Sequence, residues 1–421
     1  MTAPGPDLPA TSLIIVSRHR APTLQRCLTG VLQMAHPKAE IVVVADPAAA
    51  AGVRALGLPI KVLDFDIPNI SQARNLGLRA AAGEVVAFLD DDAVPEPSWL
   101  ARLSAPFADP AVMVAGGWVR ARNGLGWQWR AGLVDRLTRT AALEVPADAV
   151  SLHPARPGRA VEVKGVNCAY RRTALLEMGG FDPELAYYLD ETELNLRLAA
   201  RGALSAVVPG AVVHHFKAGS RQRSARRVPV SLADVGASTA ITLRRHGATL
   251  AETAARRDAL IAEERAKLLR LMLRGDLEPG AVPRLLDSLR AGFAEGAARK
   301  LAPLVPLEPL PAAGALCPVP LPPRPGRVIA GRPWQARSLR RRAADAVAAG
   351  EIVTLFLFGP SARWHWSRYL PEGFWEQTGG VCGWSLREGP RLLATRFALR
   401  VNDETRKVAL LRPVDPDRLR R

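Results

Sequence analysis

The stretch Asn69–Leu100 reads NISQARNLGLRAAAGEVVAFLDDDAVPEPSWL, and its pattern decides the fold. Its first half predicts a helix over Ser71–Ala82. The apolar run Val85–Leu89 then predicts a buried strand. This strand leads directly into three adjacent carboxylates, Asp90, Asp91 and Asp92. Because three neighbouring negative charges repel one another, the simplest reason for placing them together is a divalent cation such as Mg²⁺ or Mn²⁺, which prefers oxygen ligands.

The residues before this stretch alternate between predicted strands and helices. Short apolar runs predict buried strands at 12–16, 40–44 and 61–63. Apolar residues at helical spacing predict a helix over Thr23–Met34. Such alternation is typical of a parallel α/β sheet, in which ligands bind at the carboxyl ends of the strands. Asp46 also follows a predicted strand, so we expect it to share one crevice with the three adjacent aspartates.

Composition and pattern divide the chain into five segments. In chain order we expect a disordered leader at 1–10, an α/β domain at 11–232, a helical region at 233–300, a Pro-rich linker at 301–333 and a small Trp-rich module at 334–421. Within the α/β domain, residues 111–123 predict a further strand and residues 124–160 read as irregular. The last segment holds an apolar strand, Ile352–Phe358. Its tryptophans are expected to fill a core, although aromatic rings also stack on sugars.

The composition limits the class of protein. The 421 residues carry no apolar run of about 18, so no membrane-spanning helix is expected. The N-terminus does not resemble a secretory signal, and four scattered cysteines indicate reduced thiols in a cytoplasmic protein. The net charge of +17 fits either a bias towards arginine or attraction to an anionic surface. A basic cluster predicts either contact with anionic lipid or a solvated loop: Arg221, Arg223, Arg226 and Arg227.

Four blocks of sequence occur in a recognisable order. They are VSRHRAPTLQRCLTGVL at 16–32, NISQARNLGLRAAAGEVVAFLDDD at 69–92, GVNCAYRRTALLEMGGFDPEL at 165–185, and LDETELNLRLAARG at 189–202 followed by PGAVVHHFKAGS. With these blocks, residues 12–220 resemble a family 2 glycosyltransferase of the GT-A fold. The resemblance implies a Rossmann-like, mostly parallel sheet with flanking helices. It also implies an inverting, metal-dependent transfer of a sugar from a nucleotide-sugar donor.

The resemblance also assigns roles to individual residues. The donor site would contain Ser17, Arg18, Asp46, Arg74, Asn75, Asp90 and Asp91. Asp92 and His215 would bind the metal, Mn²⁺ or Mg²⁺, and Gly180 and Asp182 would lie on the acceptor side. Glu191 is the expected catalytic base, with Asp190 second, because the family's Glu-Asp order is swapped here.

Some residues allow another interpretation. Asp190 can cap a helix, with Glu193 completing a capping box and pairing with Arg197 one turn later. In the Asp46 block, Ala45 occupies the position where the family usually carries its first aspartate, which leaves the nucleobase open. The family's Gln-x-x-Arg-Trp motif is not found, so we expect the addition of single sugars.

We therefore expect a cytoplasmic transferase that can contact the inner face of an anionic membrane. A UDP-sugar is the expected donor, and a glycan or lipid-linked acceptor in bacterial surface polysaccharide synthesis is the expected partner; no nucleic acid is expected. A nucleotidyltransferase would need a Gly-rich loop after the first strand, and an aspartate-nucleophile phosphatase would continue Asp90–Asp92 with Gly-Thr rather than Ala93-Val94. The remaining alternative is a basic protein that has the glycosyltransferase fold but no catalytic activity. It would bind nucleic acid or membrane in a salt-sensitive way.

Overall fold

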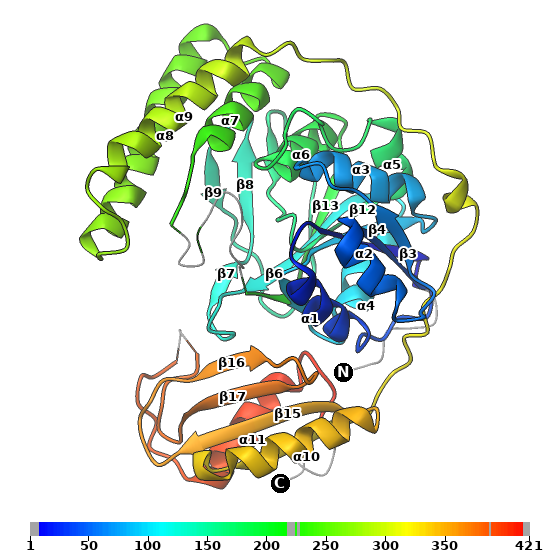
Figure 1. Ribbon diagram of the computed structural model, residues 1–421, viewed down its shortest axis with the longest axis vertical. Coiled ribbons are helices and arrows are strands. Elements are labelled where there is room, and N and C mark those ends of the chain that lie inside the picture. The colour runs from blue at the N-terminus through cyan, green and yellow to red at the C-terminus, as the bar shows by residue number, and fades with distance from the viewer. Residues whose placement is uncertain (1–7, 217–223, 225–227, 387–388, 416–421) are drawn as a thin grey trace.

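The computed structural model describes residues 8–216, 224, 228–386 and 389–415. Figure 1 shows a central sheet with helices on both faces, a separate helical arm, and a smaller sheet that carries the C-terminal part of the chain. Leu8 is buried, so the end of the predicted leader at 1–10 belongs to the folded part. The basic cluster Arg221, Arg223, Arg226 and Arg227 lies outside the described residues. The division of the chain into five domains stays a prediction.

The central sheet is mostly parallel. Its strands are β1 (Thr11–Ser17), β2 (Ala39–Ala45), β3 (Lys61–Asp64), β4 (Val85–Asp90), β5 (Ala93–Pro95), β6 (Val112–Arg120), β7 (Trp127–Trp129), β10 (Ser151–His153), β12 (Cys168–Arg171) and β13 (Leu204–His215). The order is β10-β13-β6-β12-β4-β1-β2-β3, with β5 paired to β13 and β7 to β6. β3, β2, β1 and β4 are parallel, as are β6 and β13, whereas β12 runs antiparallel to both of its neighbours. The predicted α/β class is confirmed.

Helices cover both faces of this sheet (Figure 1). One face packs against α1 (Ala21–Val31), α2 (Pro47–Arg54) and α4 (Trp99–Ser104), which continues into a short 3₁₀ turn, η1 (Ala105–Ala108). The other face packs against α3 (Ile70–Ala80), α5 (Arg172–Glu177) and α6 (Asp190–Ala200). Successive residues of β1 alternate between the two cores, with Leu13 and Ile15 in the first and Ile14 in the second. Because both faces are buried, the strands are continuous apolar runs, which made them predictable.

The stretch 124–160, predicted to be irregular, instead contains several short strands. Besides β7 and β10 these are β8 (Gly132–Asp135), β9 (Thr140–Ala142) and β11 (Arg159–Val161), which begins at the end of the stretch. β8, β9 and β11 form a separate three-stranded sheet. Each strand is three or four residues long. Strands this short carry too few residues for a period-2 pattern, so only their partners in space define them.

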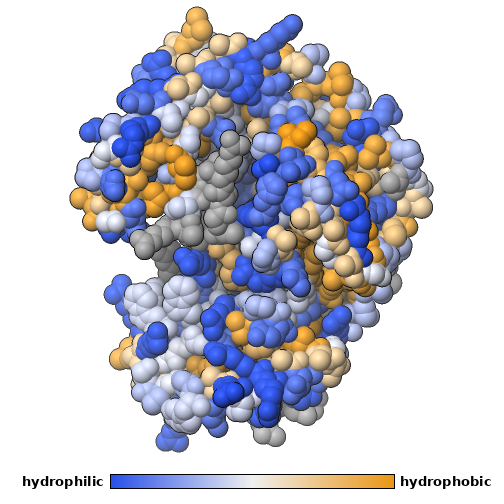
Figure 2. All heavy atoms as spheres, in the orientation of Figure 1, coloured by the Kyte–Doolittle hydropathy of each residue, from blue (hydrophilic) through white to orange (hydrophobic). Residues whose placement is uncertain are grey.

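The helical arm consists of α7 (Ala233–Arg245), α8 (Leu250–Leu273) and α9 (Ala281–Ala298), as predicted for residues 233–300. Figure 2 shows hydrophobic residues gathered over this arm at the upper left of the view. α7 and α9 cross closely at Gly236, Gly292 and Gly296, where an added Cβ would collide with the backbone of the other helix. No helix among the described residues combines the length and apolar character needed to cross a bilayer.

An extended segment, residues 301–325, runs from the arm to the smaller sheet along the edge of the α/β core (Figure 1). It contains one 3₁₀ turn, η2 (Pro311–Gly314). The amide of Leu307 donates to the Leu176 carbonyl at 2.8 Å, and the amide of Val319 donates to the Ala39 carbonyl at 2.9 Å. The segment is therefore fixed to the core by backbone hydrogen bonds over much of its length.

The C-terminal part forms a second α/β sheet. Its elements are β14 (Gly326–Gly331), η3 (Pro333–Gln335), α10 (Ala336–Ala348), β15 (Ile352–Gly359), β16 (Trp366–Tyr369), β17 (Trp375–Gly380) and α11 (Phe397–Val408). The order is β14-β15-β17-β16, in which β16 is the antiparallel edge strand. β14 lies inside the stretch 301–333 that was expected to be linker. The sequence did not show this because its Pro-rich surroundings hide a six-residue strand.

The tryptophans of this module do not all fill a core, and that expectation was wrong for three of them. Trp375 is buried. Trp334, Trp364 and Trp366 are exposed. β16 is an edge strand whose residues alternate between exposed and buried positions, which places Trp366 in solvent.

Candidate active site

A cavity of about 390 Å³ lies at the carboxyl ends of β1 and β4. The acidic residues that line it come from three places in the sequence: Asp90 and Asp92, Glu162, and Asp190 and Glu191. Basic and amide residues also line it: Arg20, Arg74, Gln128, Lys164 and His215. The position agrees with the general rule for open α/β sheets, in which ligands bind beyond the carboxyl ends of the strands.

Asp90, Asp92 and His215 form a group that fits a divalent cation. One ligand atom from each lies within 4.8 Å of the other two. Their proximity follows from the antiparallel pairing of β5 with β13, in which Ala93 lies opposite His215. Burial raises the pKa of Asp90, against the attraction of Arg74 and with added repulsion from Asp92. The two carboxylates are ligands that suit Mn²⁺ and Mg²⁺, the imidazole adds a nitrogen donor that suits a transition metal better than Mg²⁺, and a cation there would relieve the repulsion.

The middle aspartate, Asp91, faces the core and not the cavity. It is completely buried, where Ser17 Oγ donates to its Oδ2 at 2.6 Å and Arg20 Nη2 lies 2.5 Å from its Oδ1. Burial raises its pKa to about 7, and Arg20 opposes this rise. Ser17 and Asp91, both predicted to contact the donor, therefore contact each other. Arg20 also reaches Asp92 at 3.3 Å, a link that the sequence reasoning missed although Arg20 directly follows the first strand.

Arg74 contacts a carboxylate from each of two acidic stretches, Asp90–Asp92 and Asp190–Glu191. Its guanidinium forms a buried ion pair with Asp190, reaches Asp90 Oδ1 at 3.2 Å and donates to the Gly165 carbonyl at 3.3 Å. It also lies over the rings of Phe88 and Phe181. Although burial opposes it, the attraction of Asp190 and Asp90 raises the pKa of Arg74. Among the described residues its ion pairs are thus with the protein's own carboxylates, and the donor contact implied by the family resemblance stays a prediction.

Asp190 and Glu191 begin α6 at the cavity wall. Leu189 precedes them with φ = 65°, a left-handed conformation that is unusual for a residue with a branched side chain. Asp190 is buried, and burial together with the neighbouring Glu191 raises its pKa to about 7 while Arg74 opposes this. Glu191 is half-buried and lines the cavity. The helix has Leu189 as its N-cap without a side-chain bond, so Asp190 does not have the capping role considered above.

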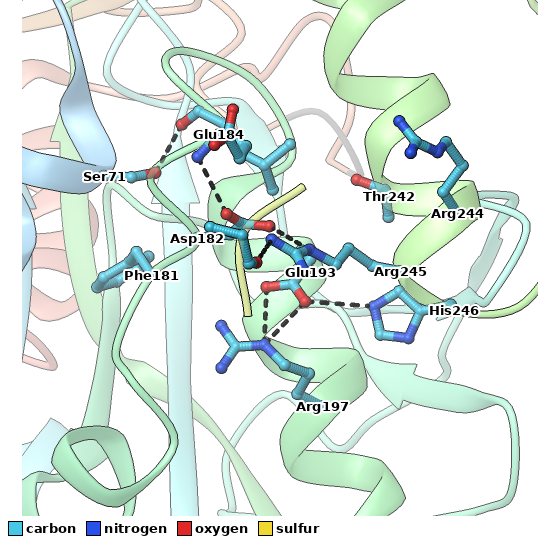
Figure 3. A network of polar contacts seen from close by, with 12 residues as sticks. Ser71, Phe181, Asp182, Glu184, Glu193, Arg197, Thr242, Arg244, Arg245 and His246 are labelled. Atoms are coloured by element: carbon cyan, nitrogen blue, oxygen red, sulfur yellow. Dashed lines mark hydrogen bonds and ion pairs between the residues drawn. The ribbon is translucent and has the colours of Figure 1, made fainter. Parts of the chain in front are cut away.

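The residues expected on the acceptor side belong to a network beside the cavity (Figure 3). Asp182 is fully buried and accepts from Arg245 Nε of α7 at 2.7 Å. Gly180 has φ = 65°, and its carbonyl accepts from Arg197 at 2.6 Å. Arg197 Nε also pairs with Glu193 at 2.8 Å, the one-turn pair that the sequence predicted. Neither Gly180 nor Asp182 is among the described residues that line the cavity.

Three residues predicted to bind the donor have partners within the protein, and their contact with a donor stays a prediction. The side chain of Asn75 bonds both the amide and the carbonyl of Phe181, at 2.8 Å each, and so fixes the Gly-Gly-Phe turn. Asp46 caps α2 through the Ala49 amide and accepts from the amide of His19. Arg18 is partly exposed and pairs with Asp66 at 2.8 Å. Asp46 and Arg18 lie just outside the cavity, at the ends of β2 and β1.

Two lining residues came from the stretch predicted to be irregular or its border. Gln128 of β7 bonds Nδ1 of His215 at 3.2 Å, which orients the imidazole. Lys164 pairs with Glu162, and its ammonium lies 4.1 Å from the centre of the Trp129 ring. No motif marked these residues, because Gln128 reaches the cavity through the pairing of β7 with β6, and Lys164 reaches it from the loop between β11 and β12.

The comparisons with known proteins place this arrangement in a family. A family model described as "Glycosyltransferase like family 2" matches residues 9–228, just over half of the chain. The chain therefore belongs to this family of glycosyltransferases. With the sheet described above, the fold is of the GT-A type, with additional C-terminal elements.

Curated relatives match part of the chain. Glycosyltransferase AglE of Haloferax volcanii is 30% identical over 119 residues, which cover 26% of this chain and 39% of that protein. The pre-mycofactocin glycosyltransferase of Mycobacterium tuberculosis is 27% identical over 222 residues, which cover 50% of this chain and 43% of that protein. The match thus spans less than half the length of either relative.

Solved structures of glycosyltransferases also resemble the chain distantly. GalNAc-T7, solved with UDP, GalNAc and Mn²⁺, is 22% identical with a TM-score of 0.42, covering 50% of this chain and 44% of that chain. The mannosyltransferase PcManGT of Pyrobaculum calidifontis, solved with GDP-Man and Mn²⁺, is 21% identical with a TM-score of 0.41, covering 70% of this chain and 89% of that chain.

Proposed function

We propose that the chain is an inverting, metal-dependent glycosyltransferase that moves a sugar from a nucleotide-sugar to an acceptor hydroxyl. The observation that carries the proposal is that one cavity contains both the Asp90–Asp92–His215 group and the Asp190–Glu191 pair. A transferase of this kind needs a cation site for the diphosphate and a carboxylate for the acceptor proton in one place. Family membership supports the class of reaction, and its inverting course is taken from the family resemblance.

Asp90, Asp92 and His215 would hold the cation. A bound Mn²⁺ or Mg²⁺ supplies stabilisation of the negative charge on the departing nucleoside diphosphate. Gln128 bonds Nδ1 of the His215 imidazole, which leaves Nε2 for the cation. Arg20 contacts Asp92 beside the group. The geometry supports Asp90 as a third proposed ligand beside Asp92 and His215, the pair predicted from the sequence.

Glu191 is the catalytic base in this proposal. Asp190 is buried against Arg74 and is poorly placed to receive a proton from a substrate hydroxyl. Glu191, one residue further, is half-buried at the cavity wall. Arg74 would act as a positioning residue, because it fixes both Asp190 and Asp90 in their orientations.

The donor and acceptor follow from the same proposal. Asp46 and Arg18, at the ends of neighbouring parallel strands, would lie next to the nucleoside, and a UDP-sugar is the proposed donor. A glycan or lipid-linked acceptor in cell-surface polysaccharide synthesis is proposed from the family resemblance. The net charge of +17 would favour contact with an anionic membrane at the cytoplasmic face.

The test is binding and hydrolysis of a panel of nucleotide-sugars, with and without Mn²⁺ or Mg²⁺. We expect metal-dependent binding of one nucleotide class that Asp92→Ala abolishes. Asp64→Ala is the matched control, because Asp64 is an exposed carboxylate paired with Arg54 away from the cavity. If wild type binds no donor but binds anionic polymers in a salt-sensitive way, the proposal is wrong and a retired, non-catalytic scaffold is the better description.

A further inference from the structure

The pairing of β5 with β13, which brings Asp92 close to His215, has a second, buried face. Because neighbouring strand residues point in opposite directions, His214 points away from the cavity. There its Nε2 lies 2.8 Å from Oε1 of Glu96, the residue that follows β5. Glu96 is also tied to the ladder by its amide, which donates to the Val212 carbonyl at 3.0 Å. A buried carboxylate thus lies directly behind the proposed metal site.

The counter-charge of Glu96 comes from the far end of the chain. Arg412 Nη2 lies 2.5 Å from Glu96 Oε1, across 316 positions of sequence. Arg412 is 3% exposed and Glu96 is 0% exposed. Trp375 of β17 closes the cluster, with its ring centre 4.1 Å from the Arg412 guanidinium and 4.3 Å from the His214 ring. The C-terminal module thus provides both the cation and the aromatic cover for this carboxylate.

The same module also reaches the other side of His215. The edge strand β16 donates from the Ser367 amide to the Asn123 carbonyl at 2.8 Å. Asn123 lies in the turn between β6 and β7, and a Cβ on the next residue, Gly124, would collide with the Ser367 carbonyl. β7 carries Gln128, which bonds His215. The module therefore contacts the surroundings of both histidines at the end of β13. Arg412 and Trp375 lie beside the His214–Glu96 pair, and Ser367 contacts the turn that precedes Gln128.

We propose that residues 326–415 are a positioning element for the metal centre, and that Arg412 is its principal positioning residue. This inference rests on the proposed metal-dependent function. Without Arg412, the Glu96 carboxylate would be buried without its cation, and it would move towards solvent or attract water. Either response shifts β5 against β13, and this pairing sets the separation between Asp92 and His215. Groups that support metal ligands from behind commonly change metal affinity when removed.

The experiment measures the binding of Mn²⁺ alone to the full chain, by electron paramagnetic resonance of the free ion. We expect Arg412→Met to weaken Mn²⁺ binding about 10-fold or more. The double variant Glu96→Gln/Arg412→Met removes both charges, so we expect it to recover to within about 3-fold of wild type. Arg340→Met is the control, because it removes a different cation of the module, one that pairs with Glu376 away from the ladder.

The outcomes separate the two proposals. If wild type binds no Mn²⁺, the proposed function is wrong, and the inference is wrong with it. If wild type and a folded Arg412→Met bind Mn²⁺ equally, only the inference is overturned. If Arg412→Met does not fold, the test uses Arg412→Lys. The lysine ammonium keeps the charge but lacks the planar guanidinium that stacks on Trp375. We therefore expect folded protein with about 3- to 5-fold weaker Mn²⁺ binding. Unchanged binding in that variant overturns the inference.

Discussion

At the scale of single residues, the partners of each carboxylate distinguish the roles at this site. Asp91 is held by Ser17 and Arg20, and Asp190 is held by Arg74. Glu191 lies beside them at the cavity wall and is less buried than either. A general base needs access to the substrate as well as a suitable pKa. Access therefore favours Glu191.

We predict that Glu191→Gln lowers the turnover number roughly 10²- to 10⁴-fold, because the amide cannot accept the acceptor's proton. Mn²⁺ binding and the free energy of unfolding are expected to stay near wild type, since Glu191 is not fully buried. Steady-state kinetics with the identified donor, alongside urea unfolding, measure both. Glu177→Gln, an exposed change on α5, is the control. Turnover within about 10-fold of wild type would contradict the role of Glu191 as base.

At the scale of elements, the helical arm contacts α6 and the loop before it through two buried carboxylates, Asp182 and Glu193. Arg245, the last residue of α7, pairs with Asp182, and the next residue, His246, lies 3.6 Å from Glu193 of α6 (Figure 3). The position of α7 is in turn set by its close crossing with α9 at small residues. The arm therefore supports α6 through α7, and this support depends on helix packing.

We predict that Gly292→Ala destabilises the protein by about 1–3 kcal/mol, because the added Cβ would collide with the backbone of Ala233 and force α7 and α9 apart. Thermal or urea unfolding of the full chain measures this loss. Gly52→Ala is the matched control: this glycine lies within α2 with open space around it, and we expect no loss of stability. Equal stability of the two variants would show that the helices adjust without cost.

At the scale of the whole molecule, the structure ties distant parts of the chain together through buried charges. The Glu96–Arg412 pair joins the α/β core to the C-terminal module. Although burial alone raises it, the attraction of Arg412 and the bond from His214 lower the pKa of Glu96 from 4.5 to about 2. The carboxylate therefore stays ionised in the folded protein at pH values where it is protonated in the unfolded chain.

This shift predicts a dependence of stability on pH. Because the folded pKa is depressed, the contribution of Glu96 is complete above pH 4.5 and is lost as the pH falls towards about 2. Its full size is about 3 kcal/mol. Urea unfolding between about pH 6 and pH 3 should show wild type losing more stability than Glu96→Gln/Arg412→Met, in which the pair is neutral. A difference between the two proteins that does not change with pH would contradict the assignment.

The sequence by itself determined the parts of the molecule that are encoded locally. The buried strands, the helices α1 and α3, and the placement of Asp90–Asp92 at a strand end follow from short runs of neighbouring residues. A resemblance in four blocks added the family, and it indicated His215 rather than His214 for the metal group.

The tertiary structure alone decided which side chains meet. Arg74 lies 116 positions from Asp190, and Arg412 lies 316 positions from Glu96. Such pairs depend on how strands and modules pack, and no local pattern records them. The short strands β7 to β11 also depend on tertiary structure, because three or four residues form a strand only when a partner provides the hydrogen bonds. The physical reason is that periodicity and strand ends are local properties, whereas charge pairing and burial are properties of the packed chain.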